Sequence, residues 1–264
     1  MNSTTQGNRF MKVVLALATS TVMAAAFAPV AVAQAPAARD RAPATAQQAL
    51  SPRQQAIAPI AASMAVGDMP QLNAALNQGL DAGLTVSEVK EILGQLYAYA
   101  GFPRSLNALG EMLKVMEARR QRGIQDAPGR DPSAPIPTGR ELLALGTANQ
   151  TRLAGAPVAG PLFEFSPQMD EYLKNHLFGA IFARDNLDWQ SRELATVGAL
   201  AAMPGVESQL QSHVQFSMNV GLTPAQMRQL GEVLGQRGQP EAARRVQAAI
   251  DRQLANSRTN APAR

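Results

Sequence analysis

The chain contains no cysteine among its 264 residues, and only 5% of them are aromatic, with a single tryptophan. Without thiols, no disulfide can form and no cysteine can serve as nucleophile, redox centre or metal ligand. Aromatic residues are also too scarce for a typical β-sandwich, whereas abundant alanine and 11 methionines suit closely packed helices. These shortages exclude thiol-dependent chemistry and favour an all-α fold.

Clustered positive charge is missing as well. The formal net charge is +4, but the arginines are scattered among acidic residues and form no long cationic run. Few aromatic side chains are present to stack on bases. We therefore expect no nucleic-acid partner.

The N-terminus has the pattern of an export signal. Arg9 and Lys12 precede an apolar stretch from Val13 to Ala28, and Ala31-Val32-Ala33 supplies small residues for a signal peptidase. This pattern predicts cleavage before Gln34 and a periplasmic or secreted protein. An uncleaved anchor is the alternative, but the apolar run is shorter than the roughly 20 residues that a membrane span needs. No later segment approaches a span, so we expect no stable membrane span after cleavage.

The remaining chain repeats itself. The stretch "LSPRQQAIAPIAASMAVGDMPQLNAALNQGLDAGLT" is matched 137 to 138 residues later by "LDWQSRELATVGALAAMPGVESQLQSHVQFSMNVGLT". The pattern of each copy predicts a helix, a glycine-containing turn, a second helix, another glycine and a third helix. Thr85 with Glu88, and Thr223 with Gln226, have the spacing of capping boxes at the start of the third helix.

Two proline-rich stretches divide the chain. "QAPAARDRAPATAQQA" predicts a flexible tether, and the four prolines of "GIQDAPGRDPSAPIPTG" rule out a continuous helix there. The predicted architecture is all-α, with two related helical units in one domain pair. In chain order we expect a signal peptide, a flexible linker, a first unit with a degenerate site, a second linker, a second unit that bears the site, and a loose tail. Their bounds are 1–33, 34–49, 50–120, 121–140, 141–252 and 253–264.

Comparison of the two copies points to a candidate site. The second copy has Glu193 where the first has Ala56, and His213 where the first has Ala75. With a turn near residue 204, about ten residues on each arm at a rise of about 1.5 Å place Glu193 and His213 at the same height of a helical hairpin. A glutamate beside an imidazole fixes its tautomer and suits it to proton transfer. We therefore predict an acid/base pair.

Other interpretations of these residues stay open. His213 can be a structural histidine that bridges helices, and Glu193 can form a solvated pair with Arg192. His176, the other histidine, can also be structural, or it can join His213 and Glu193 in a zinc site, although no short-range ligand spacing supports a metal. No nucleophile elbow, phosphate loop or dinucleotide fingerprint occurs, so we expect no cofactor.

Long stretches of the sequence resemble the carboxymuconolactone decarboxylase family, which includes alkylhydroperoxidase D-like proteins. The likeness covers about residues 50–115 and 165–237. It is strongest in "HLFGAIFARDNLDWQSRELATVGALAAM", "HVQFSMNVGLT" and "GLTVSEVKEILGQLYAYAGFPRSLNAL". The resemblance implies an all-α fold and assembly into trimers or hexamers.

The peroxidase branch of that family carries two cysteines ahead of the histidine. The matching positions here are Val206 and Gln209, and a further cysteine position is Ala100. A thiol peroxidase cannot act without thiols, so a peroxidase activity is not expected.

The decarboxylase branch keeps the histidine, which matches His213, together with Arg192 and the His-x-x-Gly that begins at His176. The resemblance implies that Arg192 and His176 bind the substrate, with Arg192 paired to its carboxylate, while His213, oriented by Glu193, moves a proton.

The family's Tyr-x-Gly-x-Pro helix is kept only in the first half, as Tyr99 to Pro103, whereas the second half has "LGQRGQPEAARR". We therefore expect Tyr97, Tyr99 and Arg104 to complete the pocket around His213.

Two functions remain. The first is an exported, cofactor-free enzyme acting on a small carboxylated or lactone-like substrate. The second is a non-catalytic oligomeric protein that binds a small molecule. A buried His213–Glu193 contact with converging polar groups would favour the enzyme.

Overall fold

The computed structural model describes residues 49–259, and their side chains as far as residue 256. The predicted signal peptide and nearly all of the first linker lie outside the described residues. Within the described range, which belongs to one compact unit, every regular element is a helix and no strand occurs. The predicted all-α class is confirmed.

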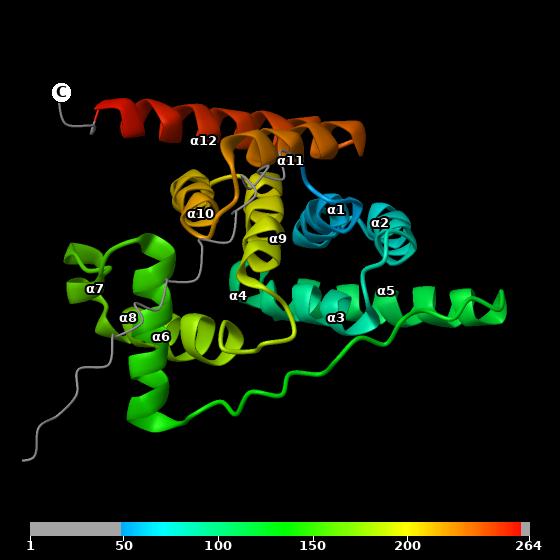
Figure 1. The fold of residues 1–264 in the computed structure, drawn as a ribbon, viewed down its shortest axis with the longest axis horizontal. Helices are drawn as coiled ribbons and strands as arrows, with labels where there is room; N and C mark the ends of the chain where they lie inside the picture. The colour runs from blue at the N-terminus through cyan, green and yellow to red at the C-terminus, as the bar shows by residue number, and fades with distance from the viewer. Residues whose placement is uncertain (1–48, 260–264) are drawn as a thin grey trace, which may run out of the picture. The chain divides into compact units, whose positions relative to one another are not determined.

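Both sequence copies form the same run of helices (Figure 1). The first copy consists of α1 (Pro52–Val66), α2 (Met69–Asp81), α3 (Val86–Gln95), the short α4 (Tyr97–Ala100) and α5 (Phe102–Gln121). The second copy consists of α9 (Trp189–Ala202), α10 (Glu207–Asn219), α11 (Pro224–Gln236) and α12 (Pro240–Thr259). Between them lie α6 (Gly139–Ala154), α7 (Pro161–Phe165), α8 (Pro167–Tyr172) and the π-helix η1 (Leu173–Ile181).

The repeat is longer than the sequence comparison indicated. Helices α5 and α12 begin at equivalent positions, each directly after or close to a glycine with positive φ, Gly101 (87°) and Gly238 (80°). Each copy therefore has a fourth long helix. Helix α12 continues to Thr259, into the segment predicted as a loose tail, because no proline or glycine interrupts it before that point.

Local signals place the helix ends as predicted. The capping boxes of Thr85 with Glu88 and of Thr223 with Gln226 are both formed. Gly205 (82°) and Gly221 (99°) take the positive φ that the turns on either side of α10 require. The hairpin of α9 and α10 is therefore determined by its own sequence.

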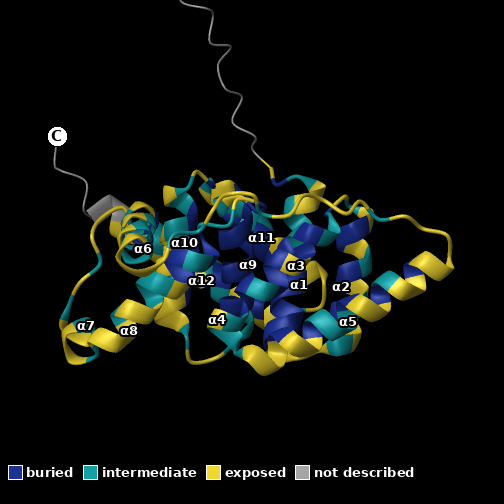
Figure 2. Cartoon of the chain, turned by 90° about the horizontal axis from the view of Figure 1, so that it is seen from below, coloured by how far each residue is buried: buried dark blue, intermediate teal, exposed yellow. Residues whose placement is uncertain are grey.

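Helices α1 and α9 form the centre of the protein. Every residue from 57 to 65 and from 191 to 201 is buried, which appears as dark blue in Figure 2. A Cβ atom on residue 198 would lie 2.7 Å from the carbonyl oxygen of Ala58, so the two helices approach closely at Gly198. Polar residues of α9 are buried along with the apolar ones.

The proline-rich segment after α5 runs extended along the edge of α3 (Figure 1). Arg119 binds Asp126 through Nε and Nη2 at 2.7–3.0 Å. The backbone N–H groups of Val86 and Ser87 then donate to the carbonyls of residues 127 and 128. This segment, residues 122–138, is called the strap below. The strap satisfies the backbone donors at the start of α3.

The chain before α9 is not one continuous helix. The π-helix η1 ends at Ile181, and residues 182–188 form a connection before α9 begins. Asp188 caps α9 by accepting from the backbone N–H of Ser191 at 2.8 Å, which starts a new helix. The π-helix lies against α6 at Gly146, where a Cβ atom would be 1.7 Å from the Lys174 carbonyl oxygen.

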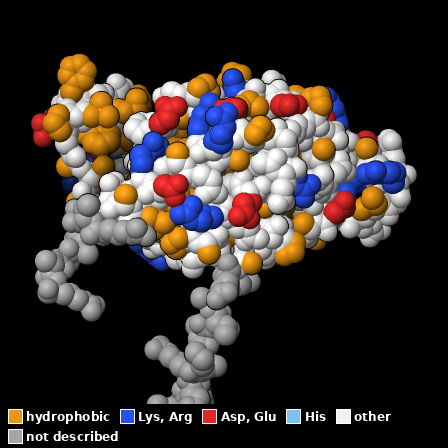
Figure 3. Space-filling view, turned by 90° about the horizontal axis from the view of Figure 1, so that it is seen from above, with side chains coloured by type: hydrophobic (Ala, Val, Ile, Leu, Met, Phe, Trp, Pro, Cys, Tyr) orange, Lys and Arg blue, Asp and Glu red, His pale blue; other side chains and the backbone are white. Residues whose placement is uncertain are grey.

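The visible surface charge and the lengths of the apolar helices bear on nucleic-acid and membrane partners. Figure 3 shows, on the face seen from above, Lys and Arg side chains interspersed with Asp and Glu side chains rather than gathered in one field. Among the described residues, no helix is both long and apolar enough to span a bilayer.

We predict that Gly198→Ala lowers the free energy of unfolding by about 1–3 kcal/mol, because the added methyl overpacks the α1–α9 crossing. Gly110→Ala on α5 is the matched control. Its Cβ meets nothing within 4 Å, so its stability should stay within about 1 kcal/mol of wild type or rise. Urea unfolding followed by circular dichroism measures both, and equal stabilities would contradict the close approach.

Candidate functional site

His213 and Glu193 meet in the interior, as the hairpin geometry predicted. The His213 Nδ1 atom lies 2.8 Å from Glu193 Oε2, with Glu193 on α9 and His213 on α10. Glu193 is fully buried, and His213 keeps 6% of its surface exposed. An ionised Glu193 accepts the Nδ1 proton, which leaves Nε2 as the nitrogen that can exchange a proton with a ligand.

Aromatic rings from two elements enclose the imidazole. The Tyr99 ring of α4 lies edge-on at 5.4 Å between ring centroids, and the Phe216 ring of α10 lies at 5.0 Å. The Tyr99 hydroxyl and Glu193 Oε1 are buried, and neither meets hydrogen-bond geometry with another described residue. The first copy therefore places a polar group beside the histidine of the second.

The electrostatics keep this hydroxyl protonated. Burial, followed by the nearby Glu193 charge, raises the pKa of Tyr99 far above its ordinary value. At neutral pH Tyr99 is thus a hydrogen-bond donor rather than a phenolate.

Arg192 points toward α3, whereas Glu193 points toward α10. Its side chain is fully buried, Nη1 donates to Gln95 Oε1 at 2.9 Å, and Nη2 donates to Glu91 Oε1 at 2.9 Å and to the Arg184 carbonyl at 2.8 Å. Burial lowers the pKa of Arg192, and Glu91 counteracts this. The terminal nitrogens expected to bind a substrate carboxylate thus have partners within the protein.

The remaining predicted site residues lie nearer the surface. His176 is exposed on η1 with its ring 5.4 Å from that of Tyr97, which in turn stacks on Phe102 at 4.2 Å. Arg104 is exposed on α5. The ring of His176 thus lies beside that of Tyr97, and the ring of His213 lies beside that of Tyr99. Among residues 49–259, no three histidine or acidic side chains converge as metal ligands would.

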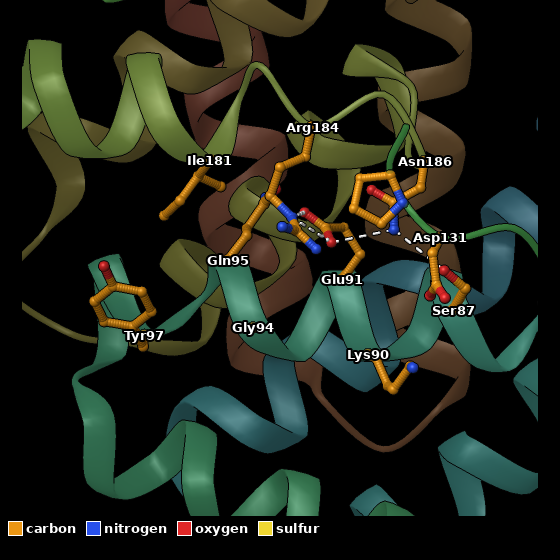
Figure 4. Close-up of a pocket in the computed structure, with 11 residues that line it drawn as sticks. Ser87, Lys90, Glu91, Gly94, Gln95, Tyr97, Asp131, Ile181, Arg184 and Asn186 are labelled. Carbon is orange, nitrogen blue, oxygen red and sulfur yellow. Dashed lines mark hydrogen bonds and ion pairs between the residues drawn. The ribbon is translucent and has the colours of Figure 1, made fainter. Parts of the chain in front are cut away.

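A cavity, missed by the sequence analysis, opens at Glu91 and Gln95, the two side chains that bind Arg192 (Figure 4). Its volume is about 350 Å3. Arg184 Nε donates to both carboxylate oxygens of Glu91 at 2.8 and 2.9 Å, and Asn186 donates to the same carboxylate at 3.2 Å. The polar residues of its wall include Ser87, Glu91, Gln95, Tyr97, Arg184 and Asn186.

One sequence signal could have pointed to this cavity. Glu91 and Gln95 are four residues apart on α3, beside the apolar stripe of Val89, Ile92 and Leu93, and both are buried. Polar residues at this spacing next to an apolar stripe share one helix face. Their partners, however, are 93 to 101 residues away in the chain.

The comparison with known proteins agrees with the internal repeat. A model of the carboxymuconolactone decarboxylase family matches residues 31–113 and 167–251, one match for each copy and together more than half of the chain. No curated protein matches the chain in sequence.

Replacement of Arg192 separates a structural role from a ligand-binding role. We predict that Arg192→Met lowers the free energy of unfolding by about 3 kcal/mol, because it leaves the buried Glu91 and Gln95 short of donors. Arg152→Met is the control, because Arg152 is exposed over the Trp189 ring at 4.4 Å and its loss should cost about 1 kcal/mol or less. Unchanged stability of Arg192→Met, measured in urea, would return Arg192 to a role in substrate binding.

The raised pKa of Tyr99 predicts a loss of stability in alkali. A tyrosine in the unfolded chain loses its proton at about pH 10, while buried Tyr99 keeps its own. Rising pH therefore favours the unfolded state, and the contribution of Tyr99 is complete below pH of about 10 and declines above it. The free energy of unfolding of wild type minus that of Tyr99→Phe should be constant from pH 7 to about pH 9 and should decrease above about pH 10. Tyr172→Phe, at an exposed tyrosine, controls for loss of a phenol, and a difference that stays constant with pH would contradict the prediction.

Proposed function

The chain belongs to the carboxymuconolactone decarboxylase family, and we propose that it is a cofactor-independent enzyme of that family. Its substrate is a small carboxylated or lactone-like molecule, and its chemistry is acid/base catalysis. The observation that carries the proposal is the buried 2.8 Å contact between His213 Nδ1 and Glu193 Oε2.

The pair suits a decarboxylation followed by proton transfer. When a carboxylate β to a carbonyl leaves as CO2, the electron pair of the broken C–C bond moves into an enolate. An imidazolium at His213 then gives its Nε2 proton to the carbon, and Glu193 stabilises the charged ring that precedes this step. Tyr99, un-ionised at neutral pH, can donate a hydrogen bond to the enolate oxygen.

The assignment of the other residues follows from their contacts. Arg192 keeps Glu91 and Gln95 in place, and so it positions α9, on which Glu193 lies. His176 lies against Tyr97 at the surface. Val206 and Gln209 occupy the positions where a thiol peroxidase needs cysteines, so that activity is not proposed.

Export and self-association are part of the proposal. The N-terminal pattern of Arg9, Lys12 and Ala31-Val32-Ala33 supports a periplasmic or secreted protein. Large apolar side chains on α5 and on α7–α8, including Leu113 (73% exposed) and Phe165 (90% exposed), support a homo-oligomer, which the family resemblance implies is a trimer or hexamer.

A second candidate is a non-catalytic oligomeric binding protein. The nearly complete enclosure of His213 by Tyr99 and Phe216 favours it, because a histidine held this way also serves as a structural bridge. In that case the fold binds a small molecule without turning it over.

A screen of carboxylated lactones for CO2 release, and for deuterium uptake from solvent, tests the proposal. With an accepted substrate, His213→Gln and Glu193→Gln should each lower kcat by roughly 10²–10⁴-fold, since general acid/base catalysis contributes that much. Ser212→Ala is the matched control, because Ser212 is exposed on the same helix and should retain full activity. Binding without turnover would support the binding protein, and full activity of His213→Gln would end the proposal.

A further inference from the structure

The cavity in Figure 4 is built by the first copy, by the strap, and by η1 with the connection that follows it. Helix α3 and Tyr97 form one wall, Ile181 and the connection after it form the other, and Asp131 and Pro132 of the strap close an edge. Its volume of about 350 Å3 lies within the range of small-molecule sites. None of the residues that line it belongs to the His213–Glu193 pair.

The charges at this cavity do not cancel. The Glu91 carboxylate is shared by two guanidinium groups, Arg184 on the cavity wall and Arg192 behind it. One negative and two positive groups leave an excess of one positive charge. Lys90 and Asp131 also line the cavity, but both are exposed and offset one another.

Arg184 has capacity left for a ligand. It binds Glu91 through Nε, and among residues 49–259 its Nη1 and Nη2 atoms have no hydrogen-bond partner. Its side chain is 37% exposed and lines the cavity. A planar guanidinium with two free nitrogens is suited to a carboxylate.

Asn186 supplies an acceptor in the same wall. Its amide nitrogen donates to Ser87 Oγ at 3.1 Å and to Glu91 at 3.2 Å, and the carboxylate requires this amide orientation. Its Oδ1 atom is therefore fixed as the acceptor, and it is buried without a partner among the described residues. A ligand hydroxyl can donate to it.

The apolar surface of the cavity determines the shape of the ligand's apolar part. Ile181 and Pro132 contribute aliphatic surface, Tyr97 contributes an aromatic ring, and Gly94 leaves α3 without a side chain at this point. The free cationic group, the buried acceptor and the apolar walls together match a flat apolar body with a carboxylate and a hydroxyl group.

We propose that this cavity is a binding site for a small hydroxylated aromatic carboxylate, anchored by Arg184 and separate from the His213–Glu193 pair. The carboxylate pairs with the free nitrogens of Arg184, the hydroxyl donates to Asn186, and the ring lies against Ile181 and Pro132.

The strap fixes the positions of Arg184 and Asn186 before a ligand binds. Ser133 donates to Asp185 from its backbone N–H and from its hydroxyl, both at 2.8 Å, and Arg130 pairs with Asp185 at 3.0 Å. These bonds lower the pKa of Asp185 and fix the connection on which Arg184 and Asn186 lie to either side. A preformed site loses little conformational entropy when the ligand binds.

Isothermal titration of the full chain with 4-hydroxybenzoate tests the proposal. Benzoate lacks the hydroxyl and 4-hydroxybenzamide lacks the charge, so each should bind roughly tenfold or more weakly. Arg184→Gln should also weaken binding of 4-hydroxybenzoate by at least about tenfold. Equal affinity for 4-hydroxybenzoate and 4-hydroxybenzamide would overturn the assignment of the anchor.

A cavity-filling variant tests the location without removing a hydrogen bond. Gly94 lines the cavity, is helical, and has nothing within 4 Å of a Cβ atom, so Gly94→Leu should fill the space and abolish binding while the protein stays folded. Gly110→Leu, at an equally open helical position on α5, should bind as wild type does. Unchanged affinity of Gly94→Leu, or no binding by the wild type at millimolar ligand, would overturn the site.

The His213→Gln variant separates this site from the proposed catalytic pair. Binding of 4-hydroxybenzoate should be unchanged in His213→Gln, whether or not the protein has lyase activity. If His213→Gln abolished binding while Gly94→Leu did not, the ligand would lie at the histidine, and the cavity proposal would be wrong without harm to the proposed function.

Discussion

The burial of α9 is the constraint on which the rest of the structure depends. The helix packs closely on α1, at Gly198 and Ala58, and each of its residues from 191 to 201 is buried. A buried polar group is costly unless it finds a partner, and four of these residues are polar: Ser191, Arg192, Glu193 and Thr196. Ser191 binds the capping residue Asp188, and α3 and α10 supply partners for the other three. Both polar sites of the protein are therefore consequences of how one central helix satisfies its own side chains.

The two sequence copies have matching helices, but they contribute different polar side chains. Their caps, glycine turns and fourth helices correspond, so each copy places its helices alike. The first copy has Ala56 and Ala75 where the second has Glu193 and His213, and it contributes the Tyr99 ring instead. It also contributes Glu91, which pairs with Arg192 of the second copy and with Arg184 of the connection before α9. Each of these two buried polar clusters thus contains residues from both copies.

Sequence reasoning succeeded where the determinants are local. The capping boxes and the glycines at 205 and 221 specify the α9–α10 hairpin, and a helical rise then brings Glu193 to His213. It failed where pairing depends on tertiary packing. The Arg184–Glu91 contact spans 93 residues, and nothing in either stretch specifies the other. The π-helix and the docking of the strap on α3 likewise follow from packing against α6 and from backbone donors that only the folded α3 presents.

The adjacency of Arg192 and Glu193 explains why two sites lie so near one another and remain distinct. Successive residues on an α-helix point about 100° apart, because a turn holds 3.6 residues. Arg192 accordingly faces Glu91 and Gln95 of α3, whereas Glu193 faces His213 of α10. A shift of α9 would displace both side chains together, but the close approach of Gly198 to Ala58 leaves little room for one. Helix α9 therefore fixes the positions of Glu193 beside His213 and of Arg192 beside Glu91, and the two side chains contact different neighbouring helices.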